Sequence, residues 1–256
     1  MAGDGRGHPA GPEDGLSELK TQFLASLNHE VRTPLTGILG MTDLLLETSL
    51  DPEQKDYVSA IRTCAGELLV LFDKTLEYSD LSCGRVTLTR REFHLQESLR
   101  GAVRGNLAGA RAKGLQLRLR MASGLPPVAI GDGPRLQRLL GHLVENAVKF
   151  TDRGRVVVGA RGRAAGNRLE LHIEVRDTGI GIAPESLPLA FQTFRQLDSG
   201  PARGYNGLGL GLSLVLGLTE LMGGVLKVDS TPGCGSTFTV VVPLELPADE
   251  SLRAAS

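Results

Sequence analysis

A proline interrupts the first long helical pattern of this chain without ending it. Pro34 removes one backbone hydrogen bond and costs a helix interior about 3 kcal/mol. His29 lies about 200° around a helix from Leu27 and is expected to face away from the apolar stripe. The stretch SLNHEVRTPL (26–35) therefore predicts a helix with an exposed histidine, beside Glu30, next to a kink. Alone, such a histidine is most often a solvated surface residue. The stripe keeps helical spacing on both sides of the proline, at Leu16, Leu19, Phe23, Leu27, Leu35, Ile38, Thr42 and Leu45.

A second helix is predicted to follow a break at residues 49–52. Asp51 can cap this helix, and Pro52 can occupy its first position. The apolar residues then alternate in steps of four and three, which makes a heptad seam of about three repeats. This pattern predicts a helical hairpin that dimerises into a four-helix bundle. The seam residues are Tyr57, Ile61, Cys64, Leu68, Leu71, Thr75 and Tyr78.

The pattern changes after Gly84 to a mixture of strands and helices. Asp132 and Pro134 have the residue types that open a helix, here running to Phe150. The order of elements predicts an α/β sandwich with helices on one face of a sheet. Strands are expected at 86–95, 115–121, 155–160, 168–175, 225–230 and 236–244, helices at 95–113 and near 210–222, and a turn at Gly166 and Asn167.

Composition excludes several classes of protein. The formal net charge of −1 does not indicate binding to nucleic acid or to an anionic membrane. Cys64, Cys83 and Cys234 are widely spaced, which argues against a disulfide framework or a zinc site and for a reducing compartment. The apolar runs are far shorter than the roughly 20 residues of a membrane-spanning helix, and the N-terminus lacks a signal-peptide core. We expect a cytoplasmic protein whose residues 1–15 are disordered.

The helix around residues 138–151 carries the first block with chemical potential. His142, Asn146 and Phe150 share one of its faces. An asparagine that faces a cleft can offer a neutral oxygen to Mg²⁺, and Lys149 a positive charge to phosphate. A lone helical asparagine is more often only polar surface.

Three further blocks lie in loops. DTGIGI (177–182) follows a strand, and Asp177 can accept a hydrogen bond from an amino group such as that of adenine. FQTFRQ (191–196) has two aromatic residues three apart, which by default only pack. GLGLGL (207–212) enters a helix whose N-terminal amides suit phosphate. It also looks like a dinucleotide fingerprint, but the βαβ context is missing.

Together, in this order and spacing, these blocks resemble a sensor histidine kinase of bacterial two-component signalling over residues 16–243. SLNHEVRTPL resembles the H box, and the later blocks resemble the N, G1, F and G2 boxes of the Bergerat-type ATP-binding fold. The resemblance is closest to the catalytic cores of hybrid-type kinases. It implies a phosphoacceptor and dimerisation domain at 16–83 and a catalytic ATP-binding domain at 84–246, flanked by tails at 1–15 and 247–256.

The resemblance also implies roles for single residues. His29 matches the phosphoacceptor, Glu30 the acid thought to hydrogen-bond its imidazole, and Thr33 the residue that positions water during dephosphorylation of a partner. The implied ligands are ATP and Mg²⁺, with Asn146 on the metal, and the implied partners are a second copy and a response-regulator receiver domain. The remaining implied ATP-site residues are Lys149, Asp177, Gly179, Gly181, Gly207, Gly209, Gly211 and Thr237.

The chain departs from the family in a few places. His142 stands where the family usually has asparagine, which puts metal geometry and rate in question. Asn28 and Leu208 also differ from the commoner residues, and both changes look tolerable. Sensor, membrane and receiver segments are missing, so we expect an excised core or a chain that receives its input from another protein.

An active autokinase is favoured because the phosphoacceptor, its acid and the ATP-site residues coexist. The competing hypothesis is a degenerate, nucleotide-binding dimeric scaffold, which only His142 supports. A gyrase-like or chaperone-like ATPase would not need the H box or the hairpin. A metal-independent hydrolase built on His29 and Glu30 lacks a nearby nucleophile.

Overall fold

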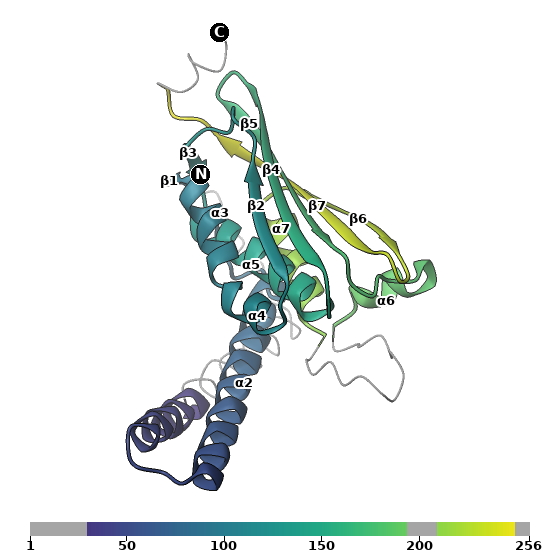
Figure 1. The fold of residues 1–256 in the computed structure, drawn as a ribbon. Helices are drawn as coiled ribbons and strands as arrows, with labels where there is room; N and C mark the ends of the chain where they lie inside the picture. Colours follow the sequence, from purple (N-terminus) through teal and green to yellow (C-terminus); the bar gives the residue numbers. More distant parts are fainter. Residues whose placement is uncertain (1–29, 194–208, 249–256) are drawn as a thin grey trace, which may run out of the picture. The chain divides into compact units, whose positions relative to one another are not determined.

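The computed structural model describes residues 30–193 and 209–248. The chain divides into two compact units, Met1–Arg85 and Val86–Ser256, which we call the hairpin unit and the sheet unit. Figure 1 traces both along the chain. None of the described helices is long and apolar enough to cross a membrane.

The hairpin unit is helical over residues 30–46 and again in α2 (Pro52–Ser82). Pro34 lies inside the first helix, as predicted, and the predicted start of the second helix is confirmed. Asp51 is the N-cap of α2, its side chain accepts a hydrogen bond from Gln54 N, and Pro52 occupies the first turn. The Gln54 side chain in turn accepts from Asp51 N, which completes a capping box and fixes where α2 begins.

Two ion pairs join the helices of the hairpin. Arg32 contacts Asp73 at 2.5 Å, and Arg62 contacts Asp43 at 2.6 Å. The two paired residues of the first helix are eleven residues apart, and so are their partners on α2, in the opposite chain direction. Eleven residues are about three turns of each helix. All four side chains are exposed, so the pairs define the register of the hairpin more than they stabilise it.

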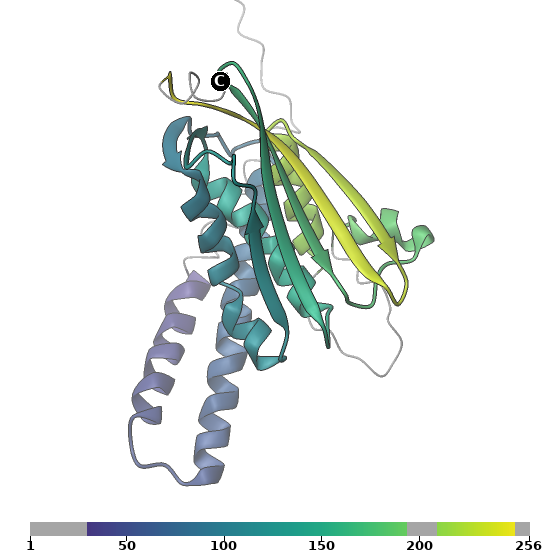
Figure 2. The same cartoon turned by 45° about the horizontal axis from the view of Figure 1, so that its top comes forward.

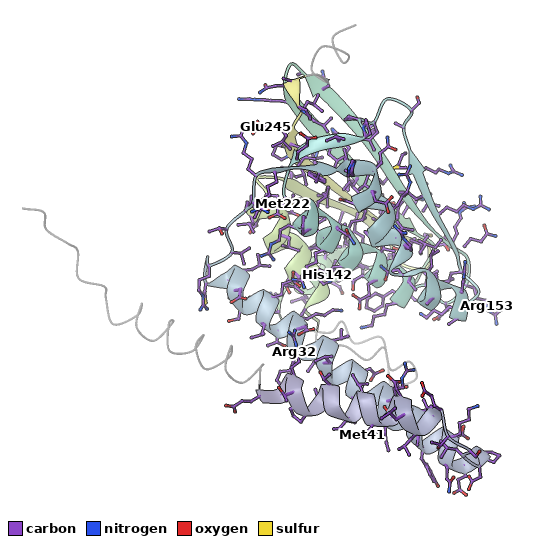
Figure 3. All side chains as sticks on the ribbon, turned by 90° about the vertical axis from the view of Figure 1, so that its left-hand side faces the viewer. Arg32, Met41, His142, Arg153, Met222 and Glu245 are labelled. Carbon is purple, nitrogen blue, oxygen red and sulfur yellow. The ribbon has the colours of Figure 1, made fainter. Side chains whose placement is uncertain are left out.

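Few apolar side chains of the hairpin unit are buried. Leu35 and Thr42, seven residues apart, are buried in the first helix, and Val58 and Ala65, also seven apart, in α2. The predicted stripe of the first helix is therefore split, because Ile38 and Leu45 of the same stripe are exposed. Within the seam, Tyr57, Ile61 and Leu68 are 60%, 50% and 46% exposed, and Met41 on the first helix is 67% exposed (Figure 3).

The sheet unit is built on seven strands in the order β1-β3-β7-β5-β4-β2, with β6 paired to β7. Neighbours are antiparallel except β2 and β4, which are parallel. Along β4, β5 and β7, buried residues alternate with more exposed ones, so the sheet has an inner and an outer face. The strands are β1 (Arg91–His94), β2 (Gln116–Met121), β3 (Val128–Gly131), β4 (Arg155–Ala165), β5 (Arg168–Asp177), β6 (Val225–Thr231) and β7 (Gly235–Glu245).

Helices cover the inner face of the sheet (Figures 1 and 2). They are α3 (Leu95–Arg104), α5 (Gly133–Lys149) and α7 (Gly211–Leu221), and α5 packs between the other two. The shorter helices are α4 (Leu107–Ala112), a 3₁₀ turn (Pro184–Ser186) and α6 (Leu187–Ala190). The predicted α/β sandwich is confirmed. Its core includes Leu95, Leu99, Leu136, Leu139, Leu140, Leu143, Leu169, Leu171, Ile173, Leu214 and Leu218.

Two sequence predictions need correction, and one strand was missed. The strand expected over 86–95 is only β1, because Thr89 N donates to the Asp132 side chain and not to a neighbouring strand. The helix expected over 95–113 is two helices: Gly105 disfavours helix, and the Asn106 side chain donates back to Ala102 O at the break. The strand β3 was not predicted, since its four residues are too few to show a period.

Candidate functional site

Asn146 lies on α5 against the first turn of α7. A Cβ placed on Gly211 would come within 2.7 Å of Asn146 Oδ1 and 2.8 Å of Nδ2, so any other residue there would displace the Asn146 side chain. Asn146 Nδ2 is buried and has no hydrogen-bond partner among the described residues. A buried amide without a partner is costly unless something else binds it. This buried amide is therefore a natural contact for a polar ligand.

A lysine from another helix caps the C-terminal end of α5. Lys113 Nζ donates to the carbonyl oxygens of Val148, Lys149 and Thr151, at 3.0, 2.6 and 3.3 Å. A cation at a helix C-terminus offsets the negative end of the helix dipole. Lys149 Nζ itself lies 5.1 Å from the centre of the Phe150 ring. Lys113 thus binds the C-terminal end of α5, and Lys149 follows Asn146 by three residues on that helix.

Asp177 ends β5 on the inner face and is only 6% exposed. Its Oδ1 accepts hydrogen bonds from Gly179 N at 2.8 Å and from Ser236 N at 3.2 Å. Burial raises the pKa of the Asp177 carboxyl, and the two backbone hydrogen bonds partly oppose that rise. Both hydrogen bonds from the described residues go to Oδ1, so Oδ2 can accept from a ligand.

Three glycines let the backbone around Asp177 pack closely. A Cβ on Gly179 would lie 2.3 Å from Phe150 O, at the end of α5. A Cβ on Gly181 would lie 2.1 Å from Thr231 O, and one on Gly235 would lie 2.2 Å from Asp177 O. Gly181 and Gly235 also have positive φ, at 69° and 99°. The loop after β5 is thereby held between α5 and the turn that joins β6 to β7.

The structure separates Thr237 from this group. Thr237 pairs with Arg176 and Asp229 across the sheet, and strand alternation puts its side chain on the outer face. Ser236, one residue earlier, is buried and on the inner face with Asp177. Ser236, and not Thr237, is therefore the neighbour of Asp177 on the inner face. The register of β7 decides which of its side chains face inward, and the sequence motif alone does not reveal that register.

The other candidate residues lie away from Asp177 in the sequence or outside the described residues. Glu30 and Thr33 lie on the first helix of the hairpin unit and are exposed. Gly209 has φ 67° and directly precedes the turn into α7. His142 lies one turn before Asn146, with its side chain 11% exposed and Nδ1 at 3.8 Å from Glu145 Oε2. His29, Gly207, Asn28, Leu208 and residues 194–196 of the FQTFRQ block lie outside the described residues.

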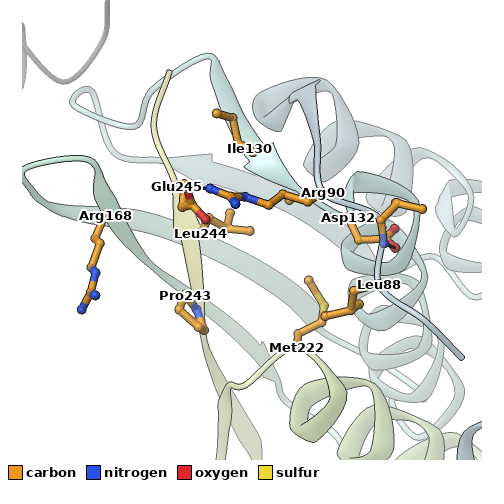
Figure 4. A pocket seen from close by; sticks show the side chains of 11 residues that line it. Leu88, Arg90, Ile130, Asp132, Arg168, Met222, Pro243, Leu244 and Glu245 are labelled. Carbon is orange, nitrogen blue, oxygen red and sulfur yellow. Dashed lines mark hydrogen bonds and ion pairs between the residues drawn. The ribbon is translucent and has the colours of Figure 1, made fainter. Parts of the chain in front are cut away.

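A hollow lies at the other end of the sheet unit. Its volume is about 450 Å³, and Leu88, Met222 and Leu244 are among the residues that line it (Figure 4). Arg168, which also lines it, begins β5, whereas Asp177 ends that strand. The hollow is therefore distinct from the group formed by Asn146, Asp177 and Ser236, and it offers a mostly apolar wall.

Two family models match the chain. The model described as "Histidine kinase-, DNA gyrase B-, and HSP90-like ATPase" matches residues 131–246. The model described as "His Kinase A (phospho-acceptor) domain" matches residues 19–84. The first match contains the cluster around Asn146 and Asp177, and the second contains the hairpin.

Curated relatives align over most of the chain. It is 38% identical over 231 residues to the signal transduction histidine-protein kinase BarA of Escherichia coli (strain K12), covering 90% of this chain and 25% of that protein. It is 38% identical over 236 residues to the sensor histidine kinase GacS of Pseudomonas protegens, covering 92% of this chain and 26% of that protein. The chain thus spans about a quarter of the length of these relatives.

Solved structures agree. The crystal structure of full-length ShkA in complex with AMPPNP matches with a TM-score of 0.73 and 35% identity, covering 89% of this chain and 46% of that one. The histidine kinase AdeS of Acinetobacter baumannii matches with a TM-score of 0.54 and 20% identity, over 84% of this chain and 96% of that one. The second likeness shows a shared fold alone.

Proposed function

Because this chain belongs to the sensor histidine kinases, we propose that it binds ATP in the sheet unit, phosphorylates His29 and passes the phosphoryl group to a receiver-domain aspartate. The observation that carries this proposal is that the sheet unit holds two polar groups able to bind a ligand. They are the side-chain amide of Asn146, which is buried without a hydrogen-bond partner among the described residues beside Gly211, and the acceptor Oδ2 of Asp177. The proposed domains are 16–83 for phosphoacceptance and dimerisation and 84–246 for catalysis.

The base end of the nucleotide is assigned to Asp177. The Asp177 carboxylate is an acceptor, and the exocyclic amino group of adenine is the donor that it would bind. Gly179 and Gly235 remove the side chains that would otherwise fill the space around it. Ser236 replaces Thr237 in this assignment, since it is the residue that hydrogen-bonds Asp177.

The phosphate end is assigned to the start of α7 and the end of α5. Amides at the N-terminus of α7 and the Lys149 ammonium suit phosphate oxygens, as do the glycines at 207, 209 and 211. The Asn146 side chain suits Mg²⁺, which prefers oxygen ligands and keeps several waters. When bound, the ion would neutralise charge on the transferred phosphoryl group.

The chemical step is a transfer from oxygen to nitrogen. A ring nitrogen of neutral His29 attacks the γ-phosphorus, the bond from that phosphorus to the bridging oxygen breaks, and ADP leaves. The proton on the other ring nitrogen becomes acidic as the ring gains positive charge, and Glu30 is the adjacent acceptor for it. The resulting phosphoramidate then passes its phosphoryl group to a receiver aspartate. Thr33 is proposed to orient the water that dephosphorylates the receiver.

A second copy of the chain is the proposed partner of the hairpin unit. Tyr57, Ile61 and Leu68 form a seam that one hairpin leaves exposed, and burial in a four-helix bundle would remove them from water. An upstream sensor is proposed to supply the input.

Incubation with γ-labelled ATP tests the function. We expect label that is labile in acid and stable in base, as a phosphoramidate is, and no such label on the His29→Gln variant. The variant should bind ATP as well as the wild type does. Acid-labile label that persists on His29→Gln would assign the phosphoacceptor to another residue.

A further inference from the structure

One serine hydroxyl on β6 connects three backbone segments around Asp177. Ser230 Oγ accepts a hydrogen bond from Ile182 N at 2.7 Å, in the loop after β5. It lies 2.9 Å from Ser236 Oγ, its direct cross-strand neighbour, and 3.2 Å from Gly235 O. Ser230 therefore contacts both the loop that follows Asp177 and the residue whose amide binds Asp177.

Counting protons limits what Ser230 can do. A serine hydroxyl has one proton to donate and two lone pairs to accept with. Ile182 N–H occupies one lone pair of Ser230, and its proton must go either to Gly235 O or to Ser236 Oγ. The distance to Ser236 Oγ is the shorter of the two and falls at the usual O–H···O length.

The choice of acceptor decides what Ser236 presents to a ligand. If Ser230 donates to Ser236 Oγ, the Ser236 proton is released to donate elsewhere. If Ser230 donates to Gly235 O, the Ser236 proton turns toward Ser230 and a lone pair is left for the ligand. Among the described residues, Ser230 is the one side-chain partner of Ser236 Oγ.

A donor beside an acceptor matches one purine better than the other. Asp177 Oδ2 accepts, Ser236 in the first arrangement donates, and the hydrogen bond from Ser236 N to Asp177 Oδ1 makes the two residues neighbours. Adenine presents an amino group beside a ring nitrogen that accepts. Guanine presents a carbonyl oxygen beside a ring N–H, so its donor and acceptor are reversed.

We propose that Ser230 is a positioning residue for base recognition, which holds the Ser236 hydroxyl as a donor and so favours adenine over guanine nucleotides. This inference rests on the proposed nucleotide site. Ser230 acts through Ser236 and not by contact with the base. Its second hydrogen bond, from Ile182 N, keeps the loop after Asp177 against β6, and that role is independent of which base binds.

The two roles predict different results for Ser230→Ala. Loss of the loop contact alone would weaken the binding of ATP and of GTP equally. Loss of the donor to Ser236 should weaken the binding of ATP but not of GTP. The expected loss of affinity is about 3- to 10-fold, which corresponds to one neutral hydrogen bond. Ser230→Thr keeps the hydroxyl and should retain the selectivity. Thr239→Ala is the matched control, because it removes a hydroxyl from the outer face of the adjacent strand.

The experiment measures dissociation constants of ATP and GTP for the full chain and each variant, together with thermal unfolding. We expect the ratio of GTP to ATP dissociation constants to fall in Ser230→Ala and to hold in Ser230→Thr and Thr239→Ala. Ser236→Ala should lower the ratio too, and the double variant should lower it no further, because both act through one hydroxyl.

An unchanged ratio in Ser230→Ala, whether or not its unfolding temperature falls, would overturn the inference and leave the ATP site standing. Additive losses in the double variant would overturn the route through Ser236. A wild-type chain that binds neither nucleotide would overturn the proposed function, and this inference with it.

Discussion

The two units of the chain bury their apolar side chains to very different degrees. Of the ten large hydrophobic residues that are exposed among the described residues, eight lie in the hairpin unit and two, Leu88 and Val225, in the sheet unit. All of the largest fully buried side chains belong to the sheet unit. The sheet unit completes its core within one chain, whereas the hairpin unit leaves an apolar surface that a partner can cover.

The candidate binding residues and the candidate phosphotransfer residues follow the same division. In the sheet unit the functional groups are buried and held by backbone hydrogen bonds, as at Asp177. In the hairpin unit Glu30 and Thr33 are exposed on a helix, where incoming domains can reach them. The proposed binding groups thus lie in the unit with the complete core, and the exposed candidate residues lie in the incomplete one.

The largest effect is expected for Asn146→Ala, which tests whether the sheet unit provides the proposed ATP site. Autophosphorylation should become undetectable, because the variant loses the buried amide beside Gly211. Labelling with γ-labelled ATP measures it. Asn167→Ala, at the exposed turn between β4 and β5, is the control and should keep full activity. Comparable labelling of both variants would remove Asn146 from the site.

The next effect concerns the exposed seam. Ile61→Lys should weaken dimerisation at least about 100-fold, because it would bury an ammonium group in the bundle. Ser59→Lys, exposed on another face of α2, should leave the dimer intact. Sedimentation at micromolar concentration measures both. A wild-type chain that is monomeric there, with normal helicity, would refute the contrast between an incomplete unit and a complete one.

Thr33→Ala tests whether exposure on the hairpin serves a second reaction. Autophosphorylation needs no water, so its rate should stay within about twofold, while dephosphorylation of a phosphorylated receiver should fall about 10- to 100-fold. Thr36→Ala, exposed on the same helix, is the control. Equal loss of both activities would mean that Thr33 supports the helix next to Pro34.

The smallest effect is on stability and tests the cost of burying Asp177. Because the folded-state pKa is raised above 3.8, the native state holds the proton more tightly than the unfolded state. Stability from this group is therefore greatest below that value and is lost as pH rises through the folded-state pKa. Without nucleotide, the free energy of unfolding should be higher for Asp177→Asn than for the wild type at neutral pH.

That advantage should vanish as pH approaches 3.8, the ordinary carboxyl value. Urea unfolding at several pH values measures it. Asp229→Asn, exposed on the outer face, is the control and should show no such trend. A pH-independent difference for Asp177→Asn would mean that its packing, not its charge, sets the change.

Sequence predicted those elements that have strong periodic or capping signals. The start of α2 at Asp51 and Pro52 and the start of α5 at Asp132 follow from local residue types, and both were correct. What sequence missed depends on long-range contacts. Thr89 is held by Asp132, 43 residues away, which ends the expected strand, and Thr237 could be assigned to a face only once its pairing with Arg176 was known.

Substitution is expected to have opposite effects at two sets of glycines, one in each unit. A coding change has two possible outcomes at Gly179, Gly181 and Gly235. It either creates a stop codon or adds a side chain whose Cβ would collide with a backbone carbonyl oxygen. At Gly37, Gly40 and Gly66 of the hairpin unit, an added Cβ meets nothing within 4 Å in the same chain. Alanine at such helical positions is worth about 1 kcal/mol of helix propensity. In a random library, the codons of Gly37, Gly40 and Gly66 would supply tolerated and even stabilising variants, while those of the three glycines around Asp177 would supply mostly inactive ones.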